Sequence, residues 1–435
     1  MLASLYIVLM VCAFLPGYAF AQPSTEDTMR QILQRLEALE KRVQSAEQAL
    51  AAKDAELAAA RKRLAERDAI PVPDHVDQDL EQGLASITNP DKSASPPVFT
   101  PDTSRWMGPH LNIRGYGDVG YLAGRMPKRT NSFGLGGLDL FITSRVSERF
   151  SVLVESVFEA TEHNEVGFEL ERALLQYRHN PHLQLDFGRY HSAIGYYNSA
   201  YHHGTWFQTA ASRPMLFQFE DHEGLLPIHN VGVRFSGTIP RAPAGLSYFA
   251  EIGNGRAYGP EGTEPVQNHG DENGGKSFNV GLQLTPEPFP GLQLGVSLYR
   301  DTAAIADSSR LRQRILAGYA VYQQGRFEWL NEMIWMHHQS LTAGTTATSI
   351  PGGYSQLAIR TGHLQPYGRF EILNPSSTDP IATQILKTPG LRREFAAGLR
   401  FDASEFVALK LQLGRVTQSG REPSLEGRLQ FAFTF

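Results

Sequence analysis

The segment RLQFAFTF, residues Arg428–Phe435, decides how the rest of the chain is interpreted. Its odd-numbered positions, from Leu429 to Phe435, are all Leu or Phe. Its even-numbered positions are Arg, Gln, Ala and Thr. Because successive side chains of a β-strand point to opposite faces, this segment predicts a strand with one apolar and one polar face.

The same alternation recurs through residues 110–435, for example in Val407–Leu413, Phe395–Phe401 and Leu292–Leu298. Soluble β-sandwiches also alternate, so the pattern alone leaves two fold classes open. The alternation predicts about sixteen strands, at residues 110–121, 137–147, 150–160, 168–178, 183–189, 228–238, 245–253, 277–285, 292–300, 312–323, 325–336, 353–361, 364–372, 391–402, 405–415 and 426–435.

The connections between these strands alternate in length, with tight turns such as Ser147–Arg149 and Gly362–His363 between longer, polar, Gly-richer loops such as Asn254–Lys276 and Asn374–Gly390. Short turns on one rim and long loops on the other are typical of bacterial outer-membrane barrels. Lipid cannot satisfy an open sheet edge, so such a sheet must close, and sixteen strands leave a water-filled lumen. The prediction is an all-β, 16-stranded antiparallel transmembrane β-barrel over residues 110–435, with both termini in the periplasm.

Three further segments precede the barrel. Residues 1–21 combine an apolar run with the ending Ala19–Ala21 and predict a signal peptide. Residues 22–67 carry a heptad pattern from Met29 to Leu64, which predicts a periplasmic α-helical coiled coil that self-associates. A single surface helix is the alternative. Residues 68–109 are Pro-rich and predict a linker.

Composition excludes several classes of function. The net charge of -5 and the absence of a basic cluster argue against nucleic-acid binding. No apolar run of the mature chain is long enough for a membrane-spanning helix. The one cysteine, Cys12, lies in the expected signal peptide, so the mature chain has no thiol for a disulfide, a thiolate metal site or a nucleophile.

The longest interruption of the strand pattern is Arg189–His229, RYHSAIGYYNSAYHHGTWFQTAASRPMLFQFEDHEGLLPIH. It contains five of the fourteen histidines and no sustained periodicity. Because long loops without their own pattern are uncommon in compact folds and are often functional, we expect this one to fold into the barrel lumen.

The run LQLDFGRYHSAIGYYN from Leu183, together with the terminal LQFAFTF, resembles bacterial outer-membrane general porins, in the superfamily that includes the phosphate-selective porins O and P. The resemblance covers about residues 110–435. It implies that the loop after the fifth strand, Tyr190–Pro227, narrows the channel. It also implies a homotrimer, and recognition of Phe435 by the outer-membrane assembly machinery.

The expected function is therefore a porin: a channel for passive diffusion of ions and small hydrophilic solutes, with outer-membrane lipid around it. Charged and aromatic residues at inward positions or in the long loop are expected at the constriction or along the pore, because such groups set ion selectivity. They are Arg189, His191, Tyr196, Tyr197, His202, His203, Arg213, Asp221, His222, Glu223, Arg114, Asp118, Arg234, Glu328, Glu332, Arg400, Lys410 and Arg428.

Arg314, Asp139, Asp186 and Glu394 are also expected on inward faces. Neither sign of charge dominates these positions and Lys is scarce, so weak selectivity is expected. A preference for anions remains one option. Histidines near the narrowest point predict that conductance varies with pH.

Three other roles compete with the channel. The loop histidines, with Asp221 and Glu223, could bind a metal ion, but polar packing of the loop is favoured, and neither a metal nor a cofactor is expected. His191–Ser192 and Asp221–His222 could enter a catalytic scheme, but adjacent residues of a strand point in opposite directions, so an enzyme is not expected. Tethering of the outer membrane through the coiled coil is the remaining alternative.

Overall fold

The structure, a computed structural model, describes residues 110–124, 131–160, 165–201, 204–220, 223–242, 245–258, 270–271, 273–305, 310–341, 346–386 and 389–435. The expected signal peptide, coiled coil and linker lie outside the described residues.

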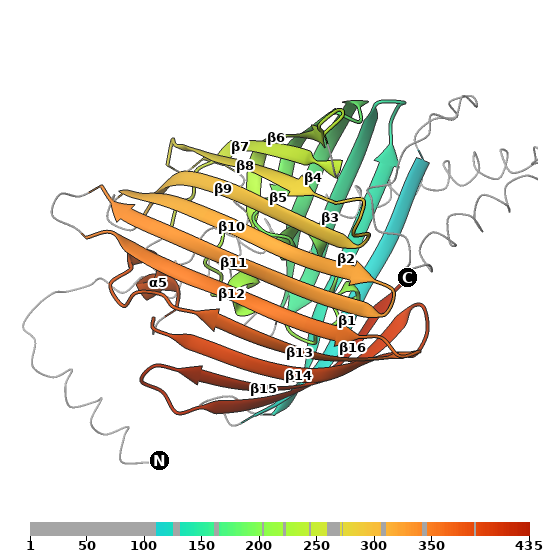
Figure 1. Cartoon of the computed structure of the whole chain (residues 1–435), viewed down its shortest axis with the longest axis vertical. Coiled ribbons are helices and arrows are strands. Elements are labelled where there is room, and N and C mark those ends of the chain that lie inside the picture. The colour runs from blue at the N-terminus through green and yellow to red at the C-terminus, as the bar shows by residue number, and fades with distance from the viewer. Residues whose placement is uncertain are drawn as a thin grey trace, which may run out of the picture. The chain divides into compact units, whose positions relative to one another are not determined.

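Sixteen antiparallel strands form one closed barrel in which each strand pairs with its neighbours in sequence, and β1 pairs with β16 (Figure 1). The strands are β1 His110–Gly124, β2 Ser132–Arg145, β3 Phe150–Ala160, β4 Val166–Asn180, β5 Leu183–His191, β6 His229–Thr238, β7 Ser247–Asn254, β8 Lys276–Leu284, β9 Leu292–Ala304, β10 Arg310–Gln324, β11 Phe327–Ser340, β12 Thr348–Ile359, β13 Leu364–Leu373, β14 Arg392–Asp402, β15 Val407–Gln418 and β16 Ser424–Thr434. The expected class and strand count are confirmed.

The barrel closes where the last strand meets the first. The amide of Gly115 donates to the carbonyl of Phe435 at 2.8 Å, and the amide of Phe435 donates back at 3.0 Å. A Cβ added at Gly115 would lie 2.1 Å from the Phe435 ring, and one at Gly117 would lie 2.7 Å from the Phe433 ring. The glycines of β1 therefore leave the space that the aromatic rings of β16 fill.

The alternation of the sequence becomes an apolar outside and a polar inside. On β15, Leu411 and Leu413 are 52% and 58% exposed on the outer face, whereas the inward Lys410 and Gln412 are buried. A belt of apolar side chains around a closed barrel is suited to contact with lipid tails.

One predicted orientation is wrong. Arg314 was expected to face the lumen, but β10 turns its buried residues Gln313 and Ile315 inward and leaves Arg314 exposed outside. The rule that apolar residues face outward fails here because Ile315, with Leu330 of β11 and Ile350 of β12, packs against residues inside the barrel.

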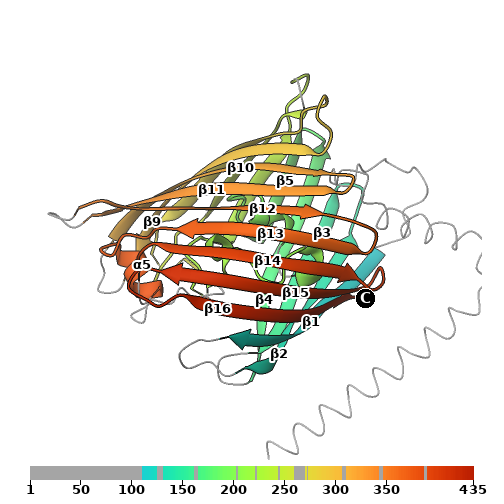
Figure 2. The same cartoon turned by 60° about the horizontal axis from the view of Figure 1, so that its bottom comes forward.

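In the residues that the structure describes, the helices are short and lie in connections between strands. α4 Tyr197–Ala200, η1 Thr205–Phe207 and η2 Met215–Phe217 belong to the segment between β5 and β6, and α5 Pro380–Ile385 lies between β13 and β14 (Figure 2). Within the described part of the chain, no helix has the length and apolar character needed to cross a membrane.

Candidate functional site

The segment between β5 and β6, residues 192–228, which we call the inner loop, packs against the inner surface of the barrel (Figure 1). His191 and His229 pair directly across β5 and β6, so the loop leaves the wall and returns to it at one point. Its buried residues Phe217 and Leu226 share one apolar cluster with wall residues such as Ile315. This packing removes part of the lumen from water.

Carboxylates of the wall bind amide groups of the inner loop. Glu332 on β11 accepts from the amides of Tyr196 and Tyr197 at 2.6 and 2.9 Å. Glu251 on β7 accepts from the amide of Ala193 at 3.1 Å. A buried carboxylate with such charge-assisted bonds satisfies loop amides that have no partner within a helix or sheet.

Cations of the wall bind carbonyl groups of the same loop. Lys410 on β15 donates to the carbonyls of Thr205 and Ala210. Arg400 on β14 donates to the carbonyl of Trp206 at 2.6 Å, with its guanidinium over the Trp206 ring. These inward charges are therefore used to hold the loop backbone.

An ion pair on β13 binds both a carbonyl and an amide of the inner loop. Arg369 donates to Glu371 at 2.6 Å and to the carbonyl of Ser212 at 2.7 Å, and Glu371 accepts from the amide of Met215. The pair is buried, and its further hydrogen bonds are what make such burial tolerable.

The inner loop also contacts β1, the strand that pairs with β16. The hydroxyl of Thr205 donates to Asp118 on β1 at 3.1 Å, and Gln430 on β16 donates to the same carboxylate at 3.0 Å. The ring of Phe207 lies 4.7 Å from that of Tyr116. The loop thus crosses the barrel interior from the root at β5 and β6 to β1.

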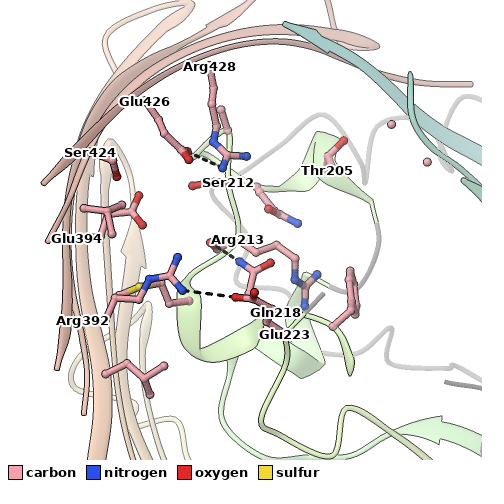
Figure 3. A pocket seen from close by; sticks show the side chains of 18 of the residues that line it. Thr205, Ser212, Arg213, Gln218, Glu223, Arg392, Glu394, Ser424, Glu426 and Arg428 are labelled. Carbon is pink, nitrogen blue, oxygen red and sulfur yellow. Dashed lines mark hydrogen bonds and ion pairs between the residues drawn. The ribbon is translucent and has the colours of Figure 1, made fainter. Parts of the chain in front are cut away.

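A cavity of about 1450 Å³ remains between the inner loop, β1 to β3 and β13 to β16 (Figure 3). Gly117, Gly136 and Gly137 form part of its lining, and because they have no side chains they leave this part of the lumen unfilled. Its charged lining residues are Asp118, Asp139, Glu159, Glu223, Glu394, Glu422 and Glu426, and Arg213, Arg392, Arg421 and Arg428.

Some of these charges pair across or along the cavity. Arg392 of the wall lies 3.8 Å from Glu223 of the loop, and Arg428 donates to Glu426 at 2.9 Å (Figure 3). Arg213 places its guanidinium 3.8 Å from the centre of the Phe219 ring. The cavity wall therefore carries both signs of charge.

One ionisable group of the inner loop is strongly influenced by its surroundings. Burial would favour the neutral acid at Glu220, but the His229 imidazole beside it outweighs this and holds the pKa of Glu220 below its usual value. Glu220 also accepts from the amides of Ile228 and His229 at 2.7 and 2.9 Å. The carboxylate is thereby kept ionised and fixed at the end of the loop.

The sequence-predicted site residues fall into four groups. The cavity lining includes Asp118, Arg213, Glu223 and Arg428. The contact between wall and inner loop contains Tyr196, Tyr197, Glu328, Glu332, Arg400 and Lys410. Buried or half-buried positions around the root of the loop hold Arg189, His191 and Arg234, whereas Arg114 is exposed near the start of β1. Outside the described residues are His202, His203, Asp221 and His222.

Sequence reasoning did not select Arg369, Glu371 or Glu171. Arg369 and Glu371 alternate with Phe370 and Ile372, so the strand pattern alone could have placed them inside. Ser192, a residue of the catalytic alternative, donates a hydrogen bond from its hydroxyl to the carbonyl of Pro227.

The comparisons with known proteins concern the fold. No protein family matches the sequence, and no curated protein matches it. Among solved structures, OmpT of Vibrio cholerae, an outer membrane protein in its trimer form, is similar with a TM-score of 0.51 at 9% identity, covering 75% of this chain and 100% of that chain. The outer membrane channel DcaP of Acinetobacter baumannii has a TM-score of 0.51 at 9% identity, covering 75% and 98%.

An anion-selective porin from Comamonas acidovorans is similar to the same degree, with a TM-score of 0.51 at 11% identity, covering 75% of this chain and 100% of that chain. At these identities the likeness shows a shared fold. The barrel therefore has the fold of outer-membrane porins and channels, without singling out the phosphate-selective porins.

Proposed function

We propose that this chain is an outer-membrane porin, a water-filled channel for the passive diffusion of ions and small hydrophilic solutes that the inner loop narrows. The observation that carries the proposal is the charge-lined cavity left between the anchored inner loop, β1 to β3 and β13 to β16. A closed barrel of sixteen strands has room for such a path, and fixed charges along it act on passing ions.

Two further observations support a place in the outer membrane. The apolar belt on the outer face is suited to lipid. The similar structures include an outer membrane channel and an anion-selective porin, each with the same fold.

For ion preference, we propose that cations pass somewhat more readily than anions. The cavity lining contains seven Asp and Glu side chains against four Arg side chains, and the acidic groups remain in excess when the buried Asp139 is left out. The Lys and Arg residues that would favour anions, Lys410 and Arg400, bind the loop backbone. The anion preference considered from the sequence is the opposite outcome of the same measurement.

The remaining parts of the proposal concern assembly. We propose a homotrimer, in line with the trimer form of the similar OmpT structure, with residues 22–67 as a periplasmic coiled coil after a signal peptide of residues 1–21. The terminal Phe435 is proposed to serve as the signal to the assembly machinery, as the porin resemblance implies.

The test is the reversal potential of the purified protein in a planar bilayer across a salt gradient. We expect conductance with a weak cation preference. In water, a unit charge changes the energy of an ion about 10 Å away by about 0.4 kcal/mol before screening, so removing two carboxylates should lower the cation-to-anion permeability ratio by roughly twofold. The variant is Glu159→Gln with Glu422→Gln, both in the cavity lining and both reached by water.

The matched control is Asp186→Asn. Asp186 is buried on β5, where it accepts from Gln176 and Gln184 and does not line the cavity, so its loss should leave the ratio unchanged. A correctly folded protein that does not conduct would overturn the channel. A chloride preference in the wild type would overturn only the proposed sign.

A further inference from the structure

Three metal-ligating side chains meet at the root of the inner loop, from three consecutive strands. They are Glu171 of β4, His191 at the end of β5 and His229 at the start of β6. One ligand atom from each lies within 4.8 Å of the other two, and all three residues are buried. Two imidazoles and a carboxylate form a common donor set for zinc and related divalent ions.

An irregularity in the pairing of β3 with β4 directs the Glu171 side chain toward the two histidines. In the pairing of β3 with β4, Arg172 lies opposite Glu155 and Leu170 opposite Ser156, so Glu171 is the extra residue of a β-bulge. Bulges redirect a side chain out of the regular alternation. This explains why the alternating pattern gave no reason to group Glu171 with the two histidines.

The two histidines are held in a fixed relation. They lie directly opposite each other in the β5 and β6 pair, with ring centres 4.9 Å apart and ring planes at 66°. The His229 Nε2 atom contacts the Glu171 carboxylate. The donor atoms of the group therefore converge on one small volume.

A fourth residue orients His229. Its Nδ1 atom lies 3.1 Å from Glu220 Oε2, and the other oxygen of that carboxylate accepts from the amides of Ile228 and His229. A carboxylate on one ring nitrogen fixes the tautomer and directs the other nitrogen to a metal, an arrangement that metal-ligating histidines usually show. This orientation is an observation independent of the ligand cluster itself.

We propose that Glu171, His191 and His229 bind a divalent transition-metal ion such as Zn²⁺, with Glu220 as the orienting carboxylate. The ion would join β4 to both ends of the inner loop and fix the loop at its root. The proposal does not depend on the channel function. The alternative to a metal ion is a proton on His229. A His229 imidazolium between the Glu171 and Glu220 carboxylates would produce the same arrangement of side chains.

The experiment uses the full-length protein in detergent, stripped with a chelator and then titrated with Zn²⁺, with the metal content measured by mass spectrometry. We expect one tightly bound Zn²⁺ per chain. Glu220→Gln should weaken binding roughly 10- to 100-fold, because it removes only the orienting carboxylate, and His191→Ala should weaken it at least as much. Zn²⁺ should also raise the unfolding temperature of the wild type and not that of His191→Ala.

The matched control is His337→Ala. His337 is a half-buried histidine of β11 that contacts Ser349 and lies outside the three-ligand group, so its variant should bind like the wild type. Folding of each variant is checked by its heat-dependent gel mobility. If His191→Ala does not fold, Glu171→Gln, which preserves side-chain size, takes its place. Wild-type protein without a stoichiometric ion, or binding as tight as that of the wild type in His191→Ala or in Glu171→Gln, would overturn the site.

Discussion

The two sides of the barrel interior use the same kind of residue in opposite ways. On β10 to β15, inward charges such as Glu332, Lys410 and Arg400 are buried and bind backbone groups of the inner loop. On β3, by contrast, the inward Glu159 is only half-buried and lines the open cavity. An inward charge thus contributes to loop stability on one side and to the electrostatic field of the cavity on the other.

The difference teaches that alternation along a strand determines the face of a side chain but not what that face meets. Water screens a charge in the cavity, so it acts weakly and over some distance on mobile ions. A buried charge that binds a peptide group acts at one place, and its loss leaves that group without a partner. The two sides should therefore respond differently to equivalent substitutions.

The largest expected effect comes from removing most of the inner loop, so that the inward charges on both sides of the barrel face water. Replacing residues 196–218 of the inner loop with a short Gly/Ser linker exposes the loop-binding wall to water and widens the path. We expect single-channel conductance to rise several-fold. Replacing 286–290, in the turn between β8 and β9, with the same linker is the control, and because this turn does not line the cavity it should leave conductance unchanged. An unchanged conductance in a folded barrel without 196–218 would show that the loop does not narrow the channel.

A smaller effect distinguishes two inward cations. Lys410→Met removes the partner of the Thr205 and Ala210 carbonyls, and since hydrogen bonds to charged groups contribute about 1.5–3 kcal/mol, we expect about that loss of stability in denaturant unfolding. Arg428→Met removes a partly exposed charge paired with Glu426 and should cost at most about 1 kcal/mol.

The reversal potential should rank these two variants in the opposite order. Arg428 lines the cavity, so its loss should increase the cation preference more than the loss of Lys410 does. Equal stability losses, or a larger change in selectivity for Lys410→Met, would contradict the division of the interior into two sides.

More of the fold than of the candidate site could be predicted from the sequence. Every strand has to present an apolar face to lipid, so alternation and turn spacing located all sixteen strands. The inward apolar residues Ile315 and Leu330 broke that rule because the inner loop covers them. That cover is a tertiary contact, which no local pattern encodes.

The roles of individual charges depend on the same long-range contacts. Lys410 binds a carbonyl 205 residues away in the chain, at Thr205, so its position on β15 could not distinguish a pore charge from a loop anchor. Glu171 was missed because a bulge turns it out of register. His202, His203, Asp221 and His222 stay predictions, since they lie outside the described residues.

The smallest expected effect contrasts the inner loop with α5, whose N-terminal cap is a single carboxylate. Asp379 caps α5 by accepting from the amides of Ile381 and Ala382, and it accepts from His338 at 2.7 Å. Burial opposes the ionised form, but these hydrogen bonds outweigh it and hold the pKa of Asp379 below its ordinary value of 3.8. A lowered pKa means that the stabilisation is present above about pH 4 and is lost as the pH falls through the lower, folded-state value.

Hydrogen exchange of 380–386, corrected for the intrinsic rate, should therefore show α5 losing about 1 kcal/mol of protection, the size of one helix cap. The loss should begin below about pH 4 and be complete once the pH has fallen past the lowered pKa of Asp379. Glu220 also has a lowered pKa, but the inner loop around it is held by Glu332, Arg369 and Lys410 as well, so amides such as that of Tyr197 should stay protected over the same range. Asp379→Asn keeps a good capping residue without the titrating charge, and it should remove the pH dependence at α5. If α5 kept its protection at low pH, or if Asp379→Asn still lost it, the Asp379 carboxylate would not be the group that holds this helix in place.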